Sequence, residues 1–245
     1  MGVMQWIRLS TLYICLGASV FGCAAKVHDL KTAQGTIEEG TRLIKDEFYD
    51  EARKQFLRVK TEFPDSGLQA KADLRIADSY FEEESYAVAA TSYQDFLKTY
   101  PSRPEAPYAL YRMALSYAKQ MPSNAQRDSR NTRKVLDTFT RLLVDYPNSK
   151  YAPEAIKWMK VAQNLLAEKS FDIAVFYEKQ NNFAAAANRY KEVVELYADN
   201  PLAEEAMANE IICLRKAGKN NVADEVTKEF QAKYPSSKYT SRIQP

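Results

Sequence analysis

A spacing that recurs five times constrains this chain more than any other feature. A small or β-branched residue is followed four positions later by a large, mostly aromatic one, three later by an apolar one and five later by proline or alanine. The copies begin at Ala52, Ala89, Val135, Ala186 and Ala223. Offsets of four and three place side chains on one face of an α-helix, and proline ends a helix. Each copy therefore predicts the second helix of a hairpin together with its end.

A partner helix is predicted before each copy. Twelve residues before the small residue lies another, mostly small, followed three positions later by a large one. Three copies show this pattern clearly: Gly40 with Leu43, Ala77 with Tyr80, and Ala174 with Tyr177. The pattern resembles the tetratricopeptide repeat, a helix-turn-helix unit of about 34 residues. In that register the repeats span residues 33–66, 70–103, 107–149, 167–200 and 204–237.

The sequence thus predicts an all-α fold, a tetratricopeptide-repeat solenoid of five helical hairpins, because such a hairpin buries its apolar stripe only by stacking on its neighbours. Nine extra residues in the third repeat match the polar stretch 120–131, which predicts a loop. Residues 150–166 keep helical spacing up to the fourth repeat. We expect one fused first helix from about 153 to 180, roughly 40 Å long.

The long helix suggests a division of the chain. Residues 33–149 form a block of three repeats, 150–237 form a block with the long helix and repeats four and five, and 238–245 form a C-terminal tail. Cys213 lies among apolar neighbours and is expected in the core.

The N-terminus carries an export signal. Residues 9–21 are uncharged and mostly apolar, but too few to span a bilayer comfortably. The segment 20–23, Val-Phe-Gly-Cys, resembles the bacterial lipobox, in which the cysteine is acylated and becomes the first mature residue. The resemblance implies a signal peptide over 1–22, a lipid anchor at Cys23 and a tail over 23–32. More than one acyl chain would hold the protein stably on a lipid bilayer. The alternative is an ordinary signal peptide with an incidental cysteine.

Composition argues against an enzyme. The single histidine, His28, lies in the predicted tail, so a histidine metal site or a Ser-His pair lacks a partner. The glycines beyond the signal are too scattered for a phosphate-binding loop. A net charge of +2 gives no basic footprint for nucleic acid. We expect no catalytic residue, metal or cofactor, and the run Glu82–Glu84 is expected to be solvated because neighbouring helical residues point apart.

The first helices of a curved helical solenoid line its concave side, and residues there that the core does not need are candidates for partner contact. In repeats one to three these candidates are Ile37, Leu74, Phe81, Tyr108, Tyr111 and Leu115. Solvated faces are rarely so apolar. The row predicts a groove for an extended or hairpin peptide with aromatic side chains. The alternative is that the N-terminal tail or another helix covers it.

The mature chain as a whole resembles the tetratricopeptide-repeat lipoproteins of the outer-membrane β-barrel assembly machine. The resemblance rests on the lipobox, the insertion in repeat three, the long helix, and the segments 145–151 and 174–189. It implies a non-catalytic scaffold on the outer membrane, facing the periplasm. Its C-terminal repeats would dock on the periplasmic domains of the barrel subunit, its N-terminal groove would receive unfolded outer-membrane proteins, and other assembly lipoproteins are further partners.

In that family an arginine contacts the barrel subunit, and the matching residue here is Arg189. A guanidinium suits a bidentate pairing with a carboxylate across an interface. The alternative for Arg189 is an intrahelical pair with Glu192.

Two other functional classes stay open. A lipid-anchored repeat scaffold for pilus-secretin assembly or cell-envelope growth would share the lipobox and the hairpins, and the fused helix is the feature that discriminates. A lipid-tethered hydrolase would need converging titratable groups, which a single histidine makes remote.

Overall fold

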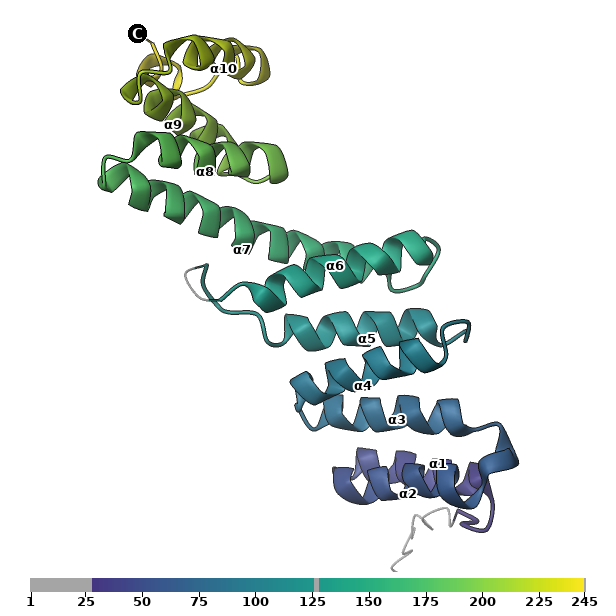
Figure 1. The fold of residues 1–245 in the computed structure, drawn as a ribbon. Helices are drawn as coiled ribbons and strands as arrows, with labels where there is room; N and C mark the ends of the chain where they lie inside the picture. Colours follow the sequence, from purple (N-terminus) through teal and green to yellow (C-terminus); the bar gives the residue numbers. More distant parts are fainter. Residues whose placement is uncertain (1–27, 126–127, 245) are drawn as a thin grey trace, which may run out of the picture.

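The computed structural model describes residues 28–125 and 128–244, and within these ranges it contains ten α-helices, two short 3-10 helices and no strand. The predictions for the signal peptide and for Cys23 lie outside the described residues. The helices stack one after another into an elongated array that begins at α1 and ends at α10 (Figure 1). The prediction of an all-α fold is confirmed.

The helices pair into five hairpins. These are α1 (Ala33–Lys45) with α2 (Tyr49–Glu62), α3 (Gln69–Glu82) with α4 (Tyr86–Thr99), α5 (Ala106–Ala118) with α6 (Arg130–Asp145), α7 (Ala152–Lys179) with α8 (Phe183–Leu196), and α9 (Ala203–Lys216) with α10 (Asn220–Lys233). The 3-10 helices are η1 (Pro64–Ser66) and η2 (Thr240–Arg242). Each helix packs mainly on the next one in the chain, as expected for a solenoid.

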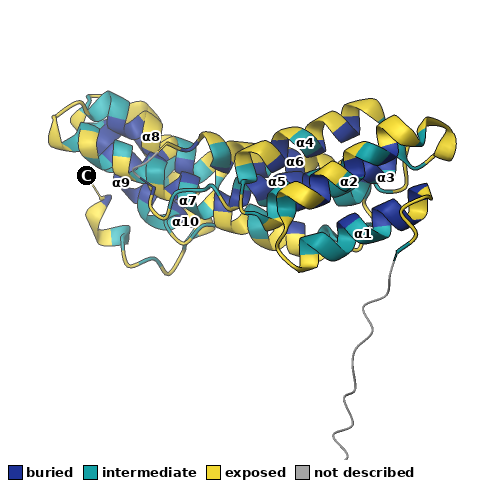
Figure 2. Ribbon diagram, turned by 90° about the horizontal axis from the view of Figure 1, so that it is seen from below, coloured by how far each residue is buried: buried dark blue, intermediate teal, exposed yellow. Residues whose placement is uncertain are grey.

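The repeated stripe forms the core. Its members are at most 2% exposed in every hairpin except at Thr227: Ala52, Phe56, Val59, Ala89, Tyr93, Phe96, Val135, Phe139, Leu142, Ala186, Tyr190, Val193, Ala223 and Phe230. Thr227 is partly exposed and its hydroxyl donates to the Ala223 carbonyl at 2.6 Å. Figure 2 shows the buried positions where neighbouring helices meet, with exposed positions on their outer sides.

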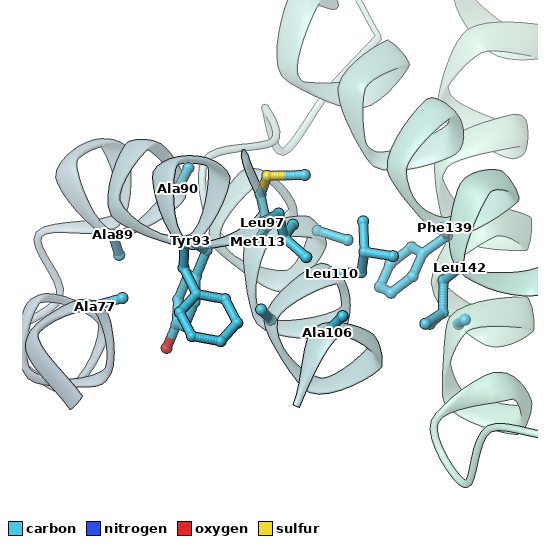
Figure 3. Close-up of a cluster of buried hydrophobic side chains, with 14 of the residues drawn as sticks. Ala77, Ala89, Ala90, Tyr93, Leu97, Ala106, Leu110, Met113, Phe139 and Leu142 are labelled. Atoms are coloured by element: carbon cyan, nitrogen blue, oxygen red, sulfur yellow. The ribbon is translucent and has the colours of Figure 1, made fainter. Parts of the chain in front are cut away.

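Close approach of paired helices depends on the small residues. A methyl group added at Gly40 would lie 2.6 Å from the Phe56 ring, so α1 and α2 are as near as glycine allows. Ala77 and Ala174, at the matching positions, are fully buried. Figure 3 shows Ala77 facing Ala89 beside the Tyr93 ring. The fifth hairpin instead buries Ile211 at this position.

Helix ends follow from local backbone chemistry. The residue that caps each second helix has a φ between −138° and −129°, outside the helical region: Phe63, Tyr100, Tyr146, Tyr197 and Tyr234. Four of the five precede proline, which disfavours the helical region for the residue before it. Inside four hairpins the turn contains a left-handed residue: Glu47, Glu84, Asn181 or Gly218.

The long helix α7 confirms the predicted fused helix. Its 28 residues correspond to a length of roughly 42 Å. Its first half contributes Ala155 and Ala162 to the core shared with α3–α6, and its second half contributes Ala167 and Ala174 to the core shared with α8–α10. A single rigid element therefore joins the two cores. Across the described ranges, neither α7 nor any other helix has the length and apolar character to cross a bilayer.

The C-terminal segment packs on the last hairpin, although the sequence suggested a tail. Ile243 is fully buried in the C-terminal core, and its carbonyl accepts from the Arg215 guanidinium. The Tyr239 hydroxyl donates to Glu205 at 3.1 Å, and Arg242 donates to the Asn209 side chain at 3.2 Å. These contacts cover one side of α9.

Two titratable groups are buried in α9. Cys213 is fully buried, as expected, and burial raises the pKa of its thiol to about 12. Glu210 is 5% exposed, and burial raises the pKa of its carboxyl to about 7. Lys191 opposes that shift, while Glu195 on α8 and Glu229 on α10 add to it.

The pKa of Glu210 predicts a stability that falls as pH rises. Below pH 4.5 the carboxyl is protonated in folded and unfolded chains, whereas above pH 7 the folded chain must bury a carboxylate. The free energy of unfolding should therefore drop between these values, by on the order of 3 kcal/mol. Glu210→Gln should remove this drop, so the variant is more stable than wild type at about pH 8, and the gain shrinks towards pH 5. Urea unfolding at both pH values measures this. The exposed Glu225→Gln on α10 serves as control, because Glu225 does not contribute to the shift at Glu210. An equal difference at both pH values would contradict the assignment.

Candidate binding groove

Two adjoining hollows lie along the first helices of the first three hairpins. The first, of about 400 Å³, lies between α1, α3 and α5, with the start of α2, and is lined among others by Tyr49, Asp78 and Tyr108. The second, of about 530 Å³, lies between α1 and α3 and reaches His28. Thr41, Lys45 and Arg75 line both. The two hollows are thus one groove, called here the N-terminal groove.

Two of the six predicted groove residues belong to the core. Ile37 is 2% exposed because it packs with Phe56 and Val59 of α2. It lines the bottom of the second hollow with only a small part of its surface. Leu74 is 8% exposed and packs in the core of the middle hairpins. The prediction that these two offer an open apolar surface is therefore corrected. Phe81, Tyr108, Tyr111 and Leu115 are all partly exposed.

Phe81 is covered on one ring face by Arg112. The guanidinium carbon lies 3.7 Å from the ring centroid, which is a cation–π contact. The same guanidinium donates to Glu82 at 2.6 Å and to the Tyr93 hydroxyl at 3.1 Å. Phe81 therefore packs under a charged side chain and does not offer a bare apolar ring face to a ligand.

The buried carboxylate of Asp78, 4% exposed, holds three helices together. It accepts from the hydroxyls of Tyr93 on α4 and Tyr108 on α5, at 2.7 and 2.8 Å, and from Arg75 at 3.0 Å. Burial and this nearby negative charge raise the pKa of both tyrosines above the usual value, so the hydroxyls remain donors. The sequence analysis missed Asp78, although an aspartate inside an apolar stripe was a visible signal.

The rings of Tyr111 and Tyr108 both contact Tyr151, which precedes α7. The Tyr111 and Tyr151 rings stack at 4.5 Å with 15° between their planes, and Tyr108 lies 6.0 Å from Tyr151. Burial and a hydrogen bond with Glu154 raise the pKa of the Tyr111 hydroxyl. The sequence analysis missed Tyr151. It connects the groove to the start of the long helix.

The rim of the groove carries mixed charge. His28 pairs with Glu38 at 3.0 Å, and Arg42 pairs with Glu39 and Asp46. Lys45 makes no ion pair or hydrogen bond with any residue that the structure describes. Within the same described residues there is no group of three His, Cys, Asp or Glu side chains that could hold a metal ion.

The acidic run 82–84 is not simply solvated. Glu82 pairs with Arg112 of α5, and Glu83 pairs with Arg53 of α2 at 3.0 Å. Arg53 is 9% exposed and also lies over the Tyr80 ring. The two carboxylates point apart, as expected, but each joins its hairpin to a neighbour.

Arg189 lies on α8 with nearly half of its side chain exposed. Its guanidinium donates to Glu192 at 2.6 Å, which is the intrahelical pair foreseen as the alternative. Leu196 is 62% exposed and lies on the same face of α8, one turn beyond Glu192 and two turns beyond Arg189. Leu196 also lines a hollow of about 300 Å³ between α6, α7 and α8, together with Ile156 and Met159.

Several known proteins are similar to this chain in sequence or in structure. The model of the YfiO family, described as outer membrane lipoprotein, matches residues 31–230. The outer membrane protein assembly factor BamD of Rickettsia prowazekii is 27% identical over 97% of this chain and 96% of its own length. The BamD proteins of Neisseria meningitidis serogroup A and Haemophilus influenzae are each 26% identical, over 93% and 91% of this chain and 92% and 89% of their own lengths. Among solved structures, the TPR2AB-domain:pHSP90 complex of yeast Sti1 aligns with a TM-score of 0.44 at 16% identity, over 85% of this chain and 80% of that one.

The groove network predicts an unequal response of two carboxylates on α3. Asp78→Asn weakens an acceptor shared by two buried hydroxyls, so it should lower the free energy of unfolding by about 2–3 kcal/mol. Asp73 also accepts from a tyrosine, Tyr100 at 2.9 Å, but its side chain is 23% exposed. Asp73→Asn should cost less than about 1 kcal/mol. Equal losses in urea unfolding would contradict the role given to Asp78.

Proposed function

Because the chain belongs to the YfiO family of outer membrane lipoproteins, we propose that it is a non-catalytic scaffold that helps to insert β-barrel proteins into the outer membrane. Relatives that align over nearly their whole length are named outer membrane protein assembly factor BamD, which supports the proposal. Neither the family nor these relatives favour the alternative role in pilus-secretin assembly or envelope growth.

The N-terminal groove is the proposed receiver of unfolded outer-membrane protein segments. The observation that carries this proposal is that Tyr49 of the first hairpin and Tyr108 of the third line the groove beside charged side chains of the first two hairpins. Tyr111 extends this aromatic surface by stacking on Tyr151. Strands of membrane barrels alternate apolar and polar residues and carry aromatic girdles. An extended segment of this kind can place its aromatic side chains on the tyrosines and its polar ones on the charged rim.

The proposed docking face for the barrel subunit's periplasmic domains is the outer stripe of α8. Arg189 and Glu192 offer a charged pair there, and Leu196 leads into the apolar hollow with Ile156 and Met159. An exposed apolar hollow beside an ion pair resembles the anatomy of protein interfaces, where an apolar centre is bordered by polar groups. Arg189 can exchange Glu192 for a carboxylate of the partner.

The proposed anchor is Cys23, facing the periplasm from the outer membrane. Five residue steps separate Cys23 from His28, so the connection reaches about 17 Å at most. Because His28 borders the N-terminal groove, an acylated Cys23 would hold that groove near the bilayer surface. The protein would then receive its substrates close to the place where they insert.

Arg189→Glu tests the docking face. Reversing this charge should repel a partner carboxylate and lower recovery of the barrel subunit several-fold when the tagged lipoprotein is purified from membranes. Arg141→Glu is the matched control, because Arg141 is an exposed arginine in an intrahelical pair on α6. Equal recovery with wild type, Arg189→Glu and Arg141→Glu would refute the assignment of Arg189. Failure to recover any barrel subunit with the wild-type chain would refute the proposed function itself.

A further inference from the structure

The start of α7 repeats the start of α5. Residues 105–109 read Glu-Ala-Pro-Tyr-Ala and residues 151–155 read Tyr-Ala-Pro-Glu-Ala, and both helices carry proline in the first turn. With these segments aligned, fully buried Ala109 matches fully buried Ala155. One further pair, Ser116 and Ala162, is also fully buried. At these positions the first half of α7 matches the first helix of a hairpin, whereas fully buried Leu110 and Ala114 correspond to exposed Ile156 and Lys160. The helix then continues into the second half of α7 instead of turning into a second helix.

In this alignment, the α5 residues in or next to the N-terminal groove have counterparts on α7. Tyr108, Tyr111, Arg112 and Leu115 of α5 correspond to Glu154, Lys157, Trp158 and Val161 of α7. All four α7 residues line one hollow of about 550 Å³, together with Lys150 and Pro153. The geometry of the hollow therefore agrees independently with the alignment of the two helix starts.

The new hollow is joined to the N-terminal groove by direct contacts. Tyr108 lines the groove and lies 6.0 Å from the Tyr151 ring, which stacks on Tyr111. Tyr151 directly precedes α7, whose residues Glu154, Lys157, Trp158 and Val161 line the hollow. The ring contacts of Tyr108 and Tyr111 with Tyr151 thus connect α5 to the residue that precedes α7.

The hollow is lined by apolar side chains, two lysines and one carboxylate, Glu154, so its charged side chains carry a net positive charge. Trp158 is partly exposed and Val161 is 46% exposed. Lys157 makes no ion pair or hydrogen bond with any described residue, and Lys150 contacts only the Tyr151 ring, at 5.1 Å from its centroid. Two exposed ammonium groups without acidic partners beside an exposed indole fit an apolar or aromatic side chain next to a carboxylate.

We propose that the hollow around Trp158 is a further subsite of the N-terminal groove, which binds an apolar or aromatic side chain and an adjacent carboxylate of an extended polypeptide. The inference rests on the proposed function, because it assigns more of the same ligand to the same groove. It extends the binding surface past the third hairpin, so the rigid helix that joins the two cores also holds the end of the ligand.

Trp158 itself reports on the test. The chain has two tryptophans, and Trp6 lies in the predicted signal peptide, so the processed lipoprotein contains Trp158 alone. The probe is a synthetic peptide of alternating aromatic and polar residues that ends in aspartate and carries a dansyl group near that end. Anisotropy of the dansyl group measures binding anywhere on the protein. Loss of Trp158 emission by energy transfer to the dansyl group measures occupation of the new subsite.

We expect both signals to change with the same midpoint in the detergent-solubilised lipoprotein. Lys150→Glu combined with Lys157→Glu should weaken binding roughly five-fold at low salt, because two attractive charges become repulsive. Lys119→Glu combined with Lys179→Glu is the matched control, since both are exposed lysines that do not line the groove or the hollow around Trp158. Lys45→Glu probes the opposite end of the groove and should also weaken binding.

The outcomes separate the two proposals. The new subsite is refuted, and the groove stands, if three results are found together. Lys45→Glu weakens peptide binding, Trp158 emission does not change, and the Lys150/Lys157 variant binds as the wild type does. An equal effect of the Lys119/Lys179 and Lys150/Lys157 double variants also refutes it, because the response is then general electrostatics. No anisotropy change with the wild-type chain refutes the groove and the subsite together.

Discussion

Close contact between a small residue and a buried aromatic ring, as in the first two hairpins, is the constraint on which the structure depends. At Gly40 the Phe56 ring fills the space that a side chain would occupy, and at Ala77 the Tyr93 ring lies beside a methyl group. Helix contacts in this chain connect mainly sequence neighbours, so errors in one pair are not corrected by distant contacts. The helix spacing in one hairpin therefore determines where the next hairpin lies, and the spacings of successive hairpins together determine the shape of the groove.

Polar contacts between hairpins fix the relative positions of the helices, which apolar packing alone does not determine. Asp78 binds two tyrosine hydroxyls from two other helices, and Arg53 connects α2 with Glu83 at the end of the second hairpin's first helix. Such contacts are directional, whereas apolar packing tolerates sliding. The long helix α7 adds a second kind of stiffness, because it is a member of both larger cores. A groove built from separate repeats can thus keep fixed distances between its tyrosines.

The sequence specified the hairpins and the long helix because both follow from helical periodicity and proline, which act locally. It did not separate core from groove at Ile37 and Leu74, because a residue's burial depends on how closely the neighbouring hairpin approaches, and periodicity carries no such distance. Pairings across hairpins, such as Glu82 with Arg112, were missed for the same reason. The left-handed turn residues Glu47 and Glu84 escaped notice because glycine and asparagine are the usual signals for that conformation. Arg189 was foreseen with two roles, and its pair with Glu192 is the one that a single chain can form.

A double-mutant cycle at Gly40 and Phe56 tests the central claim most directly. Alanine is a better helix former than glycine by about 1 kcal/mol, so Gly40→Ala should stabilise α1 unless close approach decides. The account predicts that Gly40→Ala lowers the free energy of unfolding by about 1–2 kcal/mol in the wild-type background and is neutral or stabilising together with Phe56→Leu. The same effect of Gly40→Ala in both backgrounds would contradict the claim that ring-to-backbone contact sets the spacing of the stack.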